Sequence, residues 1–214
     1  DARDMIKRLL ALRDAPVADP YTGPAVLSGP ASGVFFHEIF GHRLEGHRLK
    51  SGGQTFKKMV GEQVLPVEFQ VYCAPLLKSY ADTDLYGHYV YDDEGVKARR
   101  VDNVVNGVLK EFLMSRIPLD GFPVSNGHGR TSGGGDPVSR QSNLVIETTR
   151  PYSEKELRTM LIAEAKKQGK EYGYYLPEKF YNFVLLSQGK SVDVLPPNST
   201  YIKYNRFIDI GHAN

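Results

Sequence analysis

Two histidines and one glutamate lie within six residues of the sequence, in the segment His37-Glu38-Ile39-Phe40-Gly41-His42. Neutral imidazole nitrogen is a good zinc ligand. A carboxylate beside the first histidine is able to act as a general base toward a water that a metal activates. The segment is therefore a candidate metal site, although two histidines in one helix can equally be a surface pair or satisfied core residues.

The spacing of the two histidines places a condition on the backbone. In the common zinc-peptidase pattern HExxH the histidines are four residues apart, which puts them within roughly 40° of each other around a helix. His37 and His42 are five residues apart, which on an ideal helix separates them by roughly 140°. They can share one ion only if the helix is widened, kinked or broken between them. A π-bulge would do this, and the backbone deforms most easily at Gly41.

The neighbouring residues favour a functional group over a chance pair. The apolar run Val34-Phe35-Phe36 precedes the histidines and predicts that they are partly buried. Glu45-Gly46-His47 then adds a second carboxylate and a third histidine, which is a ligand, a support for a ligand or a solvent-facing residue. A catalytic zinc site normally has three protein ligands. The sequence alone does not supply the third, for which the candidates are Cys73, His88, His128, His212 and the carboxylates.

Apolar spacing predicts that a helix over residues 31–46 positions the histidines. Further along the chain, Asn106-Gly107 between two apolar runs is typical of a β-hairpin. Ser153 and Glu156 form a capping box before another helical run, and Gly169 stands where that helix should end.

Most of the remaining chain has the pattern of short strands. Strands are expected at residues 25–28, 64–72, 87–92, 101–105, 108–114, 143–148, 181–186 and 201–210. Residues 47–66 have the composition of a long loop, and residues 120–139 form a second, glycine-rich loop. An apolar stripe on residues 5–12 predicts a first helix. We therefore expect an α+β fold with a mostly antiparallel sheet, two or three helices, a largely buried metal-motif helix and one domain over residues 1–214.

Composition excludes several classes of protein. The chain has 214 residues, a formal net charge of +2, 41% hydrophobic and 24% charged residues, so disorder, collagen and a simple coiled coil are excluded. The near-zero charge gives no reason to expect a nucleic acid or a membrane surface as partner. A single cysteine, Cys73, excludes an intrachain disulfide framework and suits a reducing, cytoplasmic compartment. The first residue is Asp1, in what reads as the middle of a protein, so we expect a fragment of a longer chain.

Three stretches together resemble one protein family. Residues 33–47 resemble the HExxxH segment of the TldD/PmbA family of zinc metallopeptidases, once labelled modulators of DNA gyrase. Residues 90–95 with 106–114 resemble a second family stretch. Residues 126–130, followed by Pro137, Arg140 and Asn143, resemble a third. The resemblance covers roughly residues 2–190 in patches, and the first stretch is the most specific.

The resemblance implies roles for individual residues. It implies that His37 and His42 bind zinc and that Glu38 is the general base. A cysteine near the C-terminus is the third ligand that it implies, but this sequence ends in Gly211-His212-Ala213-Asn214. The chain then stops before that ligand, which we favour, or His212 replaces it, or this subfamily lacks the site. Substrate-binding roles are expected for His128, Arg140 and Asn143, with loop fixation by side-chain hydrogen bonds an equal alternative for the last two.

The resemblance also implies an activity and partners. Members pair as homodimers, or as heterodimers with a family paralogue, and cleave unfolded or short peptides. The expected function is thus a zinc-dependent peptidase of the cytoplasm, with Glu38 acting on a metal-activated water and a peptide as substrate. The alternative is a non-catalytic interaction or scaffold subunit in which the motif is a structural cluster. A gyrase-like partner depends on the old family label alone.

Overall fold

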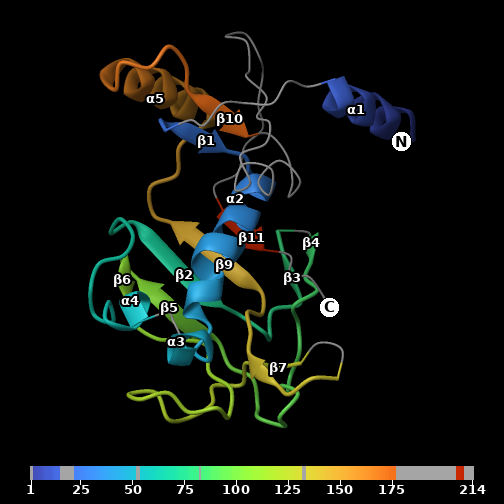
Figure 1. Ribbon diagram of the computed structural model, residues 1–214, viewed down its shortest axis with the longest axis vertical. Helices are drawn as coiled ribbons and strands as arrows, with labels where there is room; N and C mark the ends of the chain where they lie inside the picture. Colours follow the sequence, from blue (N-terminus) through green and yellow to red (C-terminus); the bar gives the residue numbers. More distant parts are fainter. Residues whose placement is uncertain are drawn as a thin grey trace. The chain divides into compact units, whose positions relative to one another are not determined.

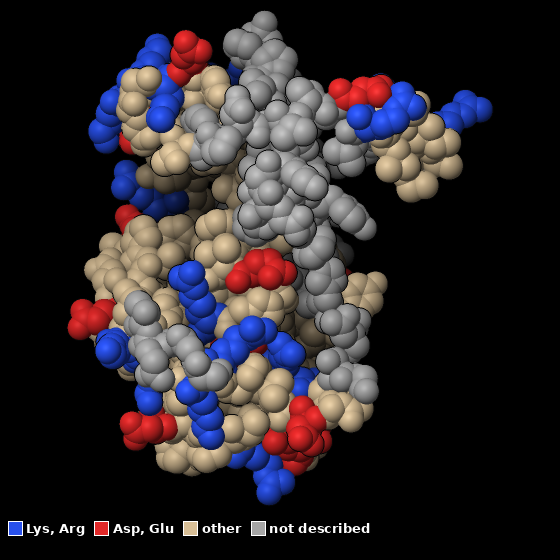
Figure 2. Space-filling model, viewed as in Figure 1, with Lys and Arg blue, Asp and Glu red and all other residues tan. Residues whose placement is uncertain are grey.

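The computed structural model describes residues 2–14, 22–51, 54–81, 83–131, 134–176 and 206–209 (Figure 1). Helices and a mainly antiparallel main sheet confirm the α+β class. The chain divides into two compact units, one of residues 1–31 with 152–204 and one of residues 32–151 with 205–214. Among the described residues, no helix is long and apolar enough to cross a membrane. On the face seen in Figure 2, acidic and basic side chains are intermixed among uncharged ones.

The second unit contains the main sheet, whose strands lie in the order β11-β9-β2-β5-β6 and are all antiparallel. Their bounds are Arg206–Asp209 (β11), Leu144–Thr148 (β9), Phe69–Cys73 (β2), Val101–Val105 (β5) and Val108–Leu109 (β6). Side chains alternate between the two faces. Val71 and Ile146 enter the principal core, whereas Tyr72 and Val145 lie in a smaller cluster on the opposite face.

Two local signals shape the β5–β6 hairpin. Asn106 and Gly107 both have positive φ, at 51° and 77°, and Val105 pairs with Val108, so the expected two-residue turn is confirmed. In β5 itself, Val71 pairs with Val104 while Tyr72 pairs with Asp102, so Asn103 is an extra residue. This bulge lets Val101 and Val104 enter the same core although they are three residues apart.

A helical segment covers the core face of this sheet. It begins as α2 (Gly29–Phe35), continues as a π-helical turn (Phe36–Phe40) and ends as a 3-10 turn (Gly41–Leu44). Phe36 and Phe40 pack in the same cluster as residues of β2 and β9, and Figure 1 shows the segment lying across these strands. Burying an aromatic or leucine side chain stabilises the fold by about 1.5–3 kcal/mol, so this packing fixes the segment that carries the candidate metal site.

Short elements complete the second unit. They are α3 (Arg48–Ser51), α4 (Gln54–Lys57), the pair β3 (Ser79–Tyr80) and β4 (Thr83–Asp84), and the pair β7 (Gly129–Arg130) and β8 (Val138–Ser139). Phe56 of α4 stacks edge-on against Phe40, with ring centroids 5.4 Å apart. The expected loop of residues 47–66 is thus partly helical, because this aromatic contact ties it to the core.

The first unit contains β1 (Ala25–Leu27), which pairs in parallel with β10 (Tyr174–Leu176), and the helix α5 (Glu154–Lys167). The Ser153 hydroxyl accepts a hydrogen bond from the Glu156 amide, and the Glu156 carboxylate accepts one from the Ser153 amide, which confirms the capping box. Gly169 follows with φ of 65°. The expected N-terminal helix is α1 (Ala2–Asp14), in which Met5, Ile6, Leu9 and Leu10 are exposed.

Three strand predictions need correction, and others lie outside the described residues. The strand expected at 64–72 begins only at Phe69, because the Phe69 amide donates to the Pro66 carbonyl in a turn just before it. Residues 87–92 do not form a strand, because Asp92 Oδ1 accepts hydrogen bonds from the amides of Glu94 and Val96 and turns the chain. The strand expected at 108–114 ends at Leu109, and the residues after it contact the metal-motif segment instead. Residues 181–186 lie outside the part that the structure describes, as does most of 201–210 except β11.

Candidate metal centre

The helix that carries the two histidines is distorted between them. Residues 36–40 form a π-helical turn, in which the Gly41 amide donates to the carbonyl of Phe36, five residues earlier, and also to that of His37. The widened turn brings residues five apart onto one side of the helix. The ring centroids of His37 and His42 are 4.7 Å apart, and the planes meet at 77°. The predicted distortion is therefore confirmed.

His37, Glu38 and His42 converge on one point. One ligand atom from each lies within 4.8 Å of the others, and all three side chains are half-buried. His42 Nε2 is 3.6 Å from Glu38 Oε2, so this nitrogen faces the group. Two imidazoles and a carboxylate are donors that suit zinc, so the residues present fit this ion. Among the described residues, no other cluster of three histidine, cysteine or acidic side chains meets the same distance.

Gly41 follows the distorted turn. We expected a glycine there because its backbone deforms easily, but the structure gives a different reason. Its φ and ψ are −59° and −45°, which any residue adopts, so it does not supply backbone freedom. A side chain at this position would instead collide with the Gln141 carboxamide. Gln141 Nε2 lies 3.4 Å from the His37 carbonyl and 3.4 Å from His42 Nδ1. The glycine therefore allows Gln141 to approach both histidines.

Glu45 lies beneath His42 and is buried, with 1% of its side chain exposed. Its Oε1 is 3.0 Å from His42 Nδ1, and its Oε2 is 2.5 Å from Arg48 Nε and 3.5 Å from Arg140 Nη1. Burial by itself would raise the pKa of Glu45. The hydrogen bonds and positive charges of His42 and Arg48 outweigh burial and hold this pKa below its usual value. The carboxylate is therefore ionised at neutral pH.

Backbone hydrogen bonds on both sides of Glu45 fix its position. The Leu113 amide donates to the Leu44 carbonyl at 2.8 Å, and the Gly46 amide donates to the Leu113 carbonyl at 2.9 Å. This is a parallel bridge between Glu45 and Leu113. Leu44 and Leu113 are both fully buried, so the pairing lies inside the core.

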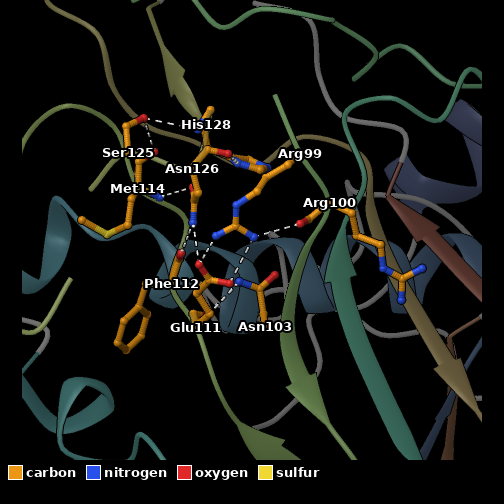
Figure 3. A network of polar contacts seen from close by, with 10 residues as sticks. Arg99, Arg100, Asn103, Glu111, Phe112, Met114, Ser125, Asn126 and His128 are labelled. Carbon is orange, nitrogen blue, oxygen red and sulfur yellow. Dashed lines mark hydrogen bonds and ion pairs between the residues drawn. The ribbon is translucent and has the colours of Figure 1, made fainter. Parts of the chain in front are cut away.

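Asn126 in turn holds the segment that contains Leu113. Its Oδ1 accepts from the Met114 amide at 2.8 Å, and its Nδ2 donates to the Phe112 carbonyl at 2.8 Å. Figure 3 shows this amide at the centre of the network, with the ion pair of Arg99 and Glu111 beside it. Bonds on both sides of Leu113 therefore connect the Asn-Gly stretch at 126–127 to the candidate metal centre.

Comparison with known proteins decides the family. Residues 20–176 match the family described as the PmbA/TldA metallopeptidase C-terminal domain. The chain belongs to this metallopeptidase family.

Relatives in the family match parts of their own length. A metalloprotease of Archaeoglobus fulgidus is 34% identical over 123 residues, which are 58% of this chain and 28% of that protein. A zinc metalloprotease TldD homolog of Saccharolobus solfataricus is 33% identical over 95 residues, 44% of this chain and 20% of that protein. The structure of TldE from Thermococcus kodakarensis superposes with a TM-score of 0.53 at 20% identity, over 73% of this chain and 34% of that one, which shows a shared fold. The chain thus spans less than two thirds of these metallopeptidase-family proteins.

Of the three residues expected to bind substrate, only Arg140 lies beside the group, through Glu45. His128 is fully buried, with its ring nitrogens 3.3 Å from the Asn126 carbonyl and 3.3 Å from Ser142 Oγ. Burial lowers the pKa of His128 to about 4, against the opposing effect of the Asn126 carbonyl. Asn143 is also fully buried. It donates to the carbonyls of Ala74 and Leu77, at 3.2 and 2.8 Å, and so fixes the loop after β2.

Among the described residues, Glu38 is the only side chain that joins the two histidines in the group. No further histidine, cysteine or carboxylate of this part of the chain lies close enough. Cys73 is fully buried in the principal core, among residues such as Val71 and Ile146. His47 is half-buried near Glu45, and burial is the main reason that its pKa lies below the usual value. His88 is not part of the group, and His212 lies outside the described residues.

Sequence reasoning missed two parts of the centre. Glu45 is recognisable from the sequence only as an additional carboxylate near the histidines. The one signal of its role is its spacing of three residues from His42. The sequence does not predict a role for Gln141. Its only signal was its place beside Arg140 in the third family-like stretch, because no pattern in the sequence shows that it approaches Gly41.

Proposed function

We propose that this chain is the metal-binding part of a zinc-dependent peptidase that acts on unfolded or short peptides. The convergence of His37, His42 and Glu38 across the π-helical turn carries this proposal. Membership of the metallopeptidase family supports it, and so does the relative that is named a zinc metalloprotease.

His37 and His42 would hold the ion through imidazole nitrogens. Zinc, when bound, supplies Lewis acidity that lowers the pKa of a water and polarises the peptide carbonyl. Glu38 accepts the proton from the attacking water and then delivers it to the nitrogen of the leaving amine. Its carboxylate is half-buried and faces His42 Nε2 at 3.6 Å, so it lies beside the atoms that would hold the ion.

Arg140 would help to place the peptide. Its guanidinium has five N–H donors, and its Nη1 nitrogen faces Glu45. Because 39% of the side chain is exposed, the remaining donors are able to reach a peptide carbonyl. The whole protein would act as a homodimer or as a heterodimer with a family paralogue. A buried single cysteine is compatible with the cytoplasm as its compartment.

A second candidate function is a non-catalytic interaction or scaffold subunit. The observation in its favour is that the described residues offer two histidines and Glu38 but neither a third histidine nor a cysteine. On this hypothesis the full-length protein binds no zinc.

Metal analysis of the full-length protein and of three variants, one of them a control, tests the proposal. We expect about one zinc per chain, loss of zinc in His42→Ala, and retained zinc without peptide hydrolysis in Glu38→Gln. Glu62→Gln removes an exposed carboxylate elsewhere in the same unit and should leave zinc and hydrolysis unchanged. Hydrolysis by Glu38→Gln at the wild-type rate would refute the role of Glu38. Absence of zinc at saturating concentration would favour the scaffold.

A further inference from the structure

We propose that Glu45 is a positioning residue that keeps His42 in the one tautomer able to bind a metal. The inference builds on the proposed function, because it concerns how a ligand of that site is prepared. It starts from the two ring nitrogens of His42, which face different surroundings.

The two contacts of His42 assign its proton. Nε2 faces Glu38 Oε2 at 3.6 Å, on the side of the group. Nδ1 faces Glu45 Oε1 at 3.0 Å, inside the core. A neutral imidazole carries one N–H and one lone pair. Because a carboxylate only accepts hydrogen bonds, the N–H is at Nδ1 and the lone pair is at Nε2, on the side of the metal.

Two other polar groups approach Nδ1, and both are donors. Gln141 Nε2 and Arg48 Nη2 each lie 3.4 Å from it. Donation from either would place the lone pair at Nδ1 and the proton at Nε2. The contact with Glu45 is 0.4 Å shorter than both and involves a charged acceptor, which makes it the stronger one. Glu45 therefore decides the tautomer.

The arginines keep the carboxylate in place. Arg48 Nε and Arg140 Nη1 both bind Oε2, which leaves Oε1 for His42. The backbone bridge to Leu113 fixes the position of residue 45, and the side chain is buried. Rotation of the carboxylate would exchange its oxygens without removing an acceptor from His42.

Glutamine in place of Glu45 would reverse which of the two groups, His42 Nδ1 or the side chain of residue 45, donates the hydrogen bond. Its single oxygen is required by two guanidinium groups, so the amide would place its NH₂ group toward His42. Nδ1 would then become the acceptor, and the proton would move to Nε2. A metal can bind that nitrogen only after the proton has left. Substitution of groups that orient a ligand typically weakens metal binding about 10- to 100-fold.

Nitrogen NMR of the metal-free, full-length protein labelled with ¹⁵N at histidine tests this inference. We expect the wild-type His42 to be protonated at Nδ1 and Glu45→Gln to be protonated at Nε2. Arg43→Ala removes an exposed positive charge next to His42 and should keep the wild-type tautomer. A wild-type His42 protonated at Nε2 would overturn the proposal, and this measurement does not need any variant to fold.

Zinc affinity provides the second measurement, by competition with a chromophoric chelator. Glu45→Gln should bind zinc about 10- to 100-fold more weakly than the wild type, whereas Arg43→Ala should not differ. If Glu45→Gln fails to fold, Arg48→Ala should weaken binding in the same direction by loosening the carboxylate. Unchanged affinity in a folded Glu45→Gln variant would refute the inference. Tight zinc binding without peptide hydrolysis in the wild type would refute the proposed function and leave this inference intact.

Discussion

His128 should make the folded protein sensitive to mild acid. Its side chain is completely buried, and burial lowers its pKa to about 4 from an ordinary value of 6.5. The unfolded chain therefore binds a proton at this histidine between these two values, whereas the folded chain does not. The stabilisation is fully present above about pH 6.5 and is lost as the pH falls toward about 4.

The size of the effect follows from the same shift. One bound proton changes the free energy of unfolding by about 1.4 kcal/mol per pH unit, so the full loss is about 3 kcal/mol. Small domains are stabilised by about 5–15 kcal/mol in total, so this loss is easily measured. His47 acts in the same direction, because burial lowers its pKa too. The contribution of His128 must therefore be obtained by comparing the wild type with a variant that lacks this histidine.

The assay is urea unfolding of wild type and His128→Gln across about pH 4 to about pH 7. Glutamine is uncharged and removes one titrating group, so the wild type should lose about 1.4 kcal/mol more per pH unit than the variant. Proton NMR of the His128 ring gives the pKa directly and requires no variant. Equal slopes in the two proteins, or titration of His128 near its ordinary pKa, would refute the reasoning.

Two further predictions concern the supports of the metal centre. Gly41→Ala should lower the free energy of unfolding by at most about 1 kcal/mol, because the new methyl group meets only the flexible end of the Gln141 side chain, which can move aside. Urea unfolding should show that adding Gln141→Ala removes this loss, and a loss that persists unchanged in the double variant would contradict the contact with Gln141. Asn126→Ala should cost about 1–3 kcal/mol for each backbone group that it leaves unpaired, at Met114 and Phe112. Thermal unfolding measures this, with the exposed Glu62→Gln as the control.

The features that the sequence predicted correctly are local. The five-residue spacing of His37 and His42 requires a widened turn, and the structure has one. The hairpin at Asn106-Gly107 and the capping box of Ser153 and Glu156 each depend on a few neighbouring residues. Such signals are readable because the backbone geometry that they specify needs no distant partner.

The features that it did not predict depend on distant contacts. Gln141 reaches Gly41 from a hundred residues away, and Arg140 reaches Glu45 in the same manner. His128 is fully buried, and nothing in the sequence indicates this burial. Residue type does not tell a buried histidine from an exposed one, because burial depends on how distant parts of the chain pack.

The π-helical turn is, in effect, a helix that contains one surplus residue. Removing a single residue between His37 and His42 would bring the pair to the spacing of an ordinary helix. Because the widened turn absorbs the surplus residue, the same deletion would restore an ordinary α-helical turn and leave the following chain, including Glu45 beside Leu113, close to its present phase. The extra residue is thus contained within one turn: it brings both imidazoles to the same side without displacing the chain that continues into the core.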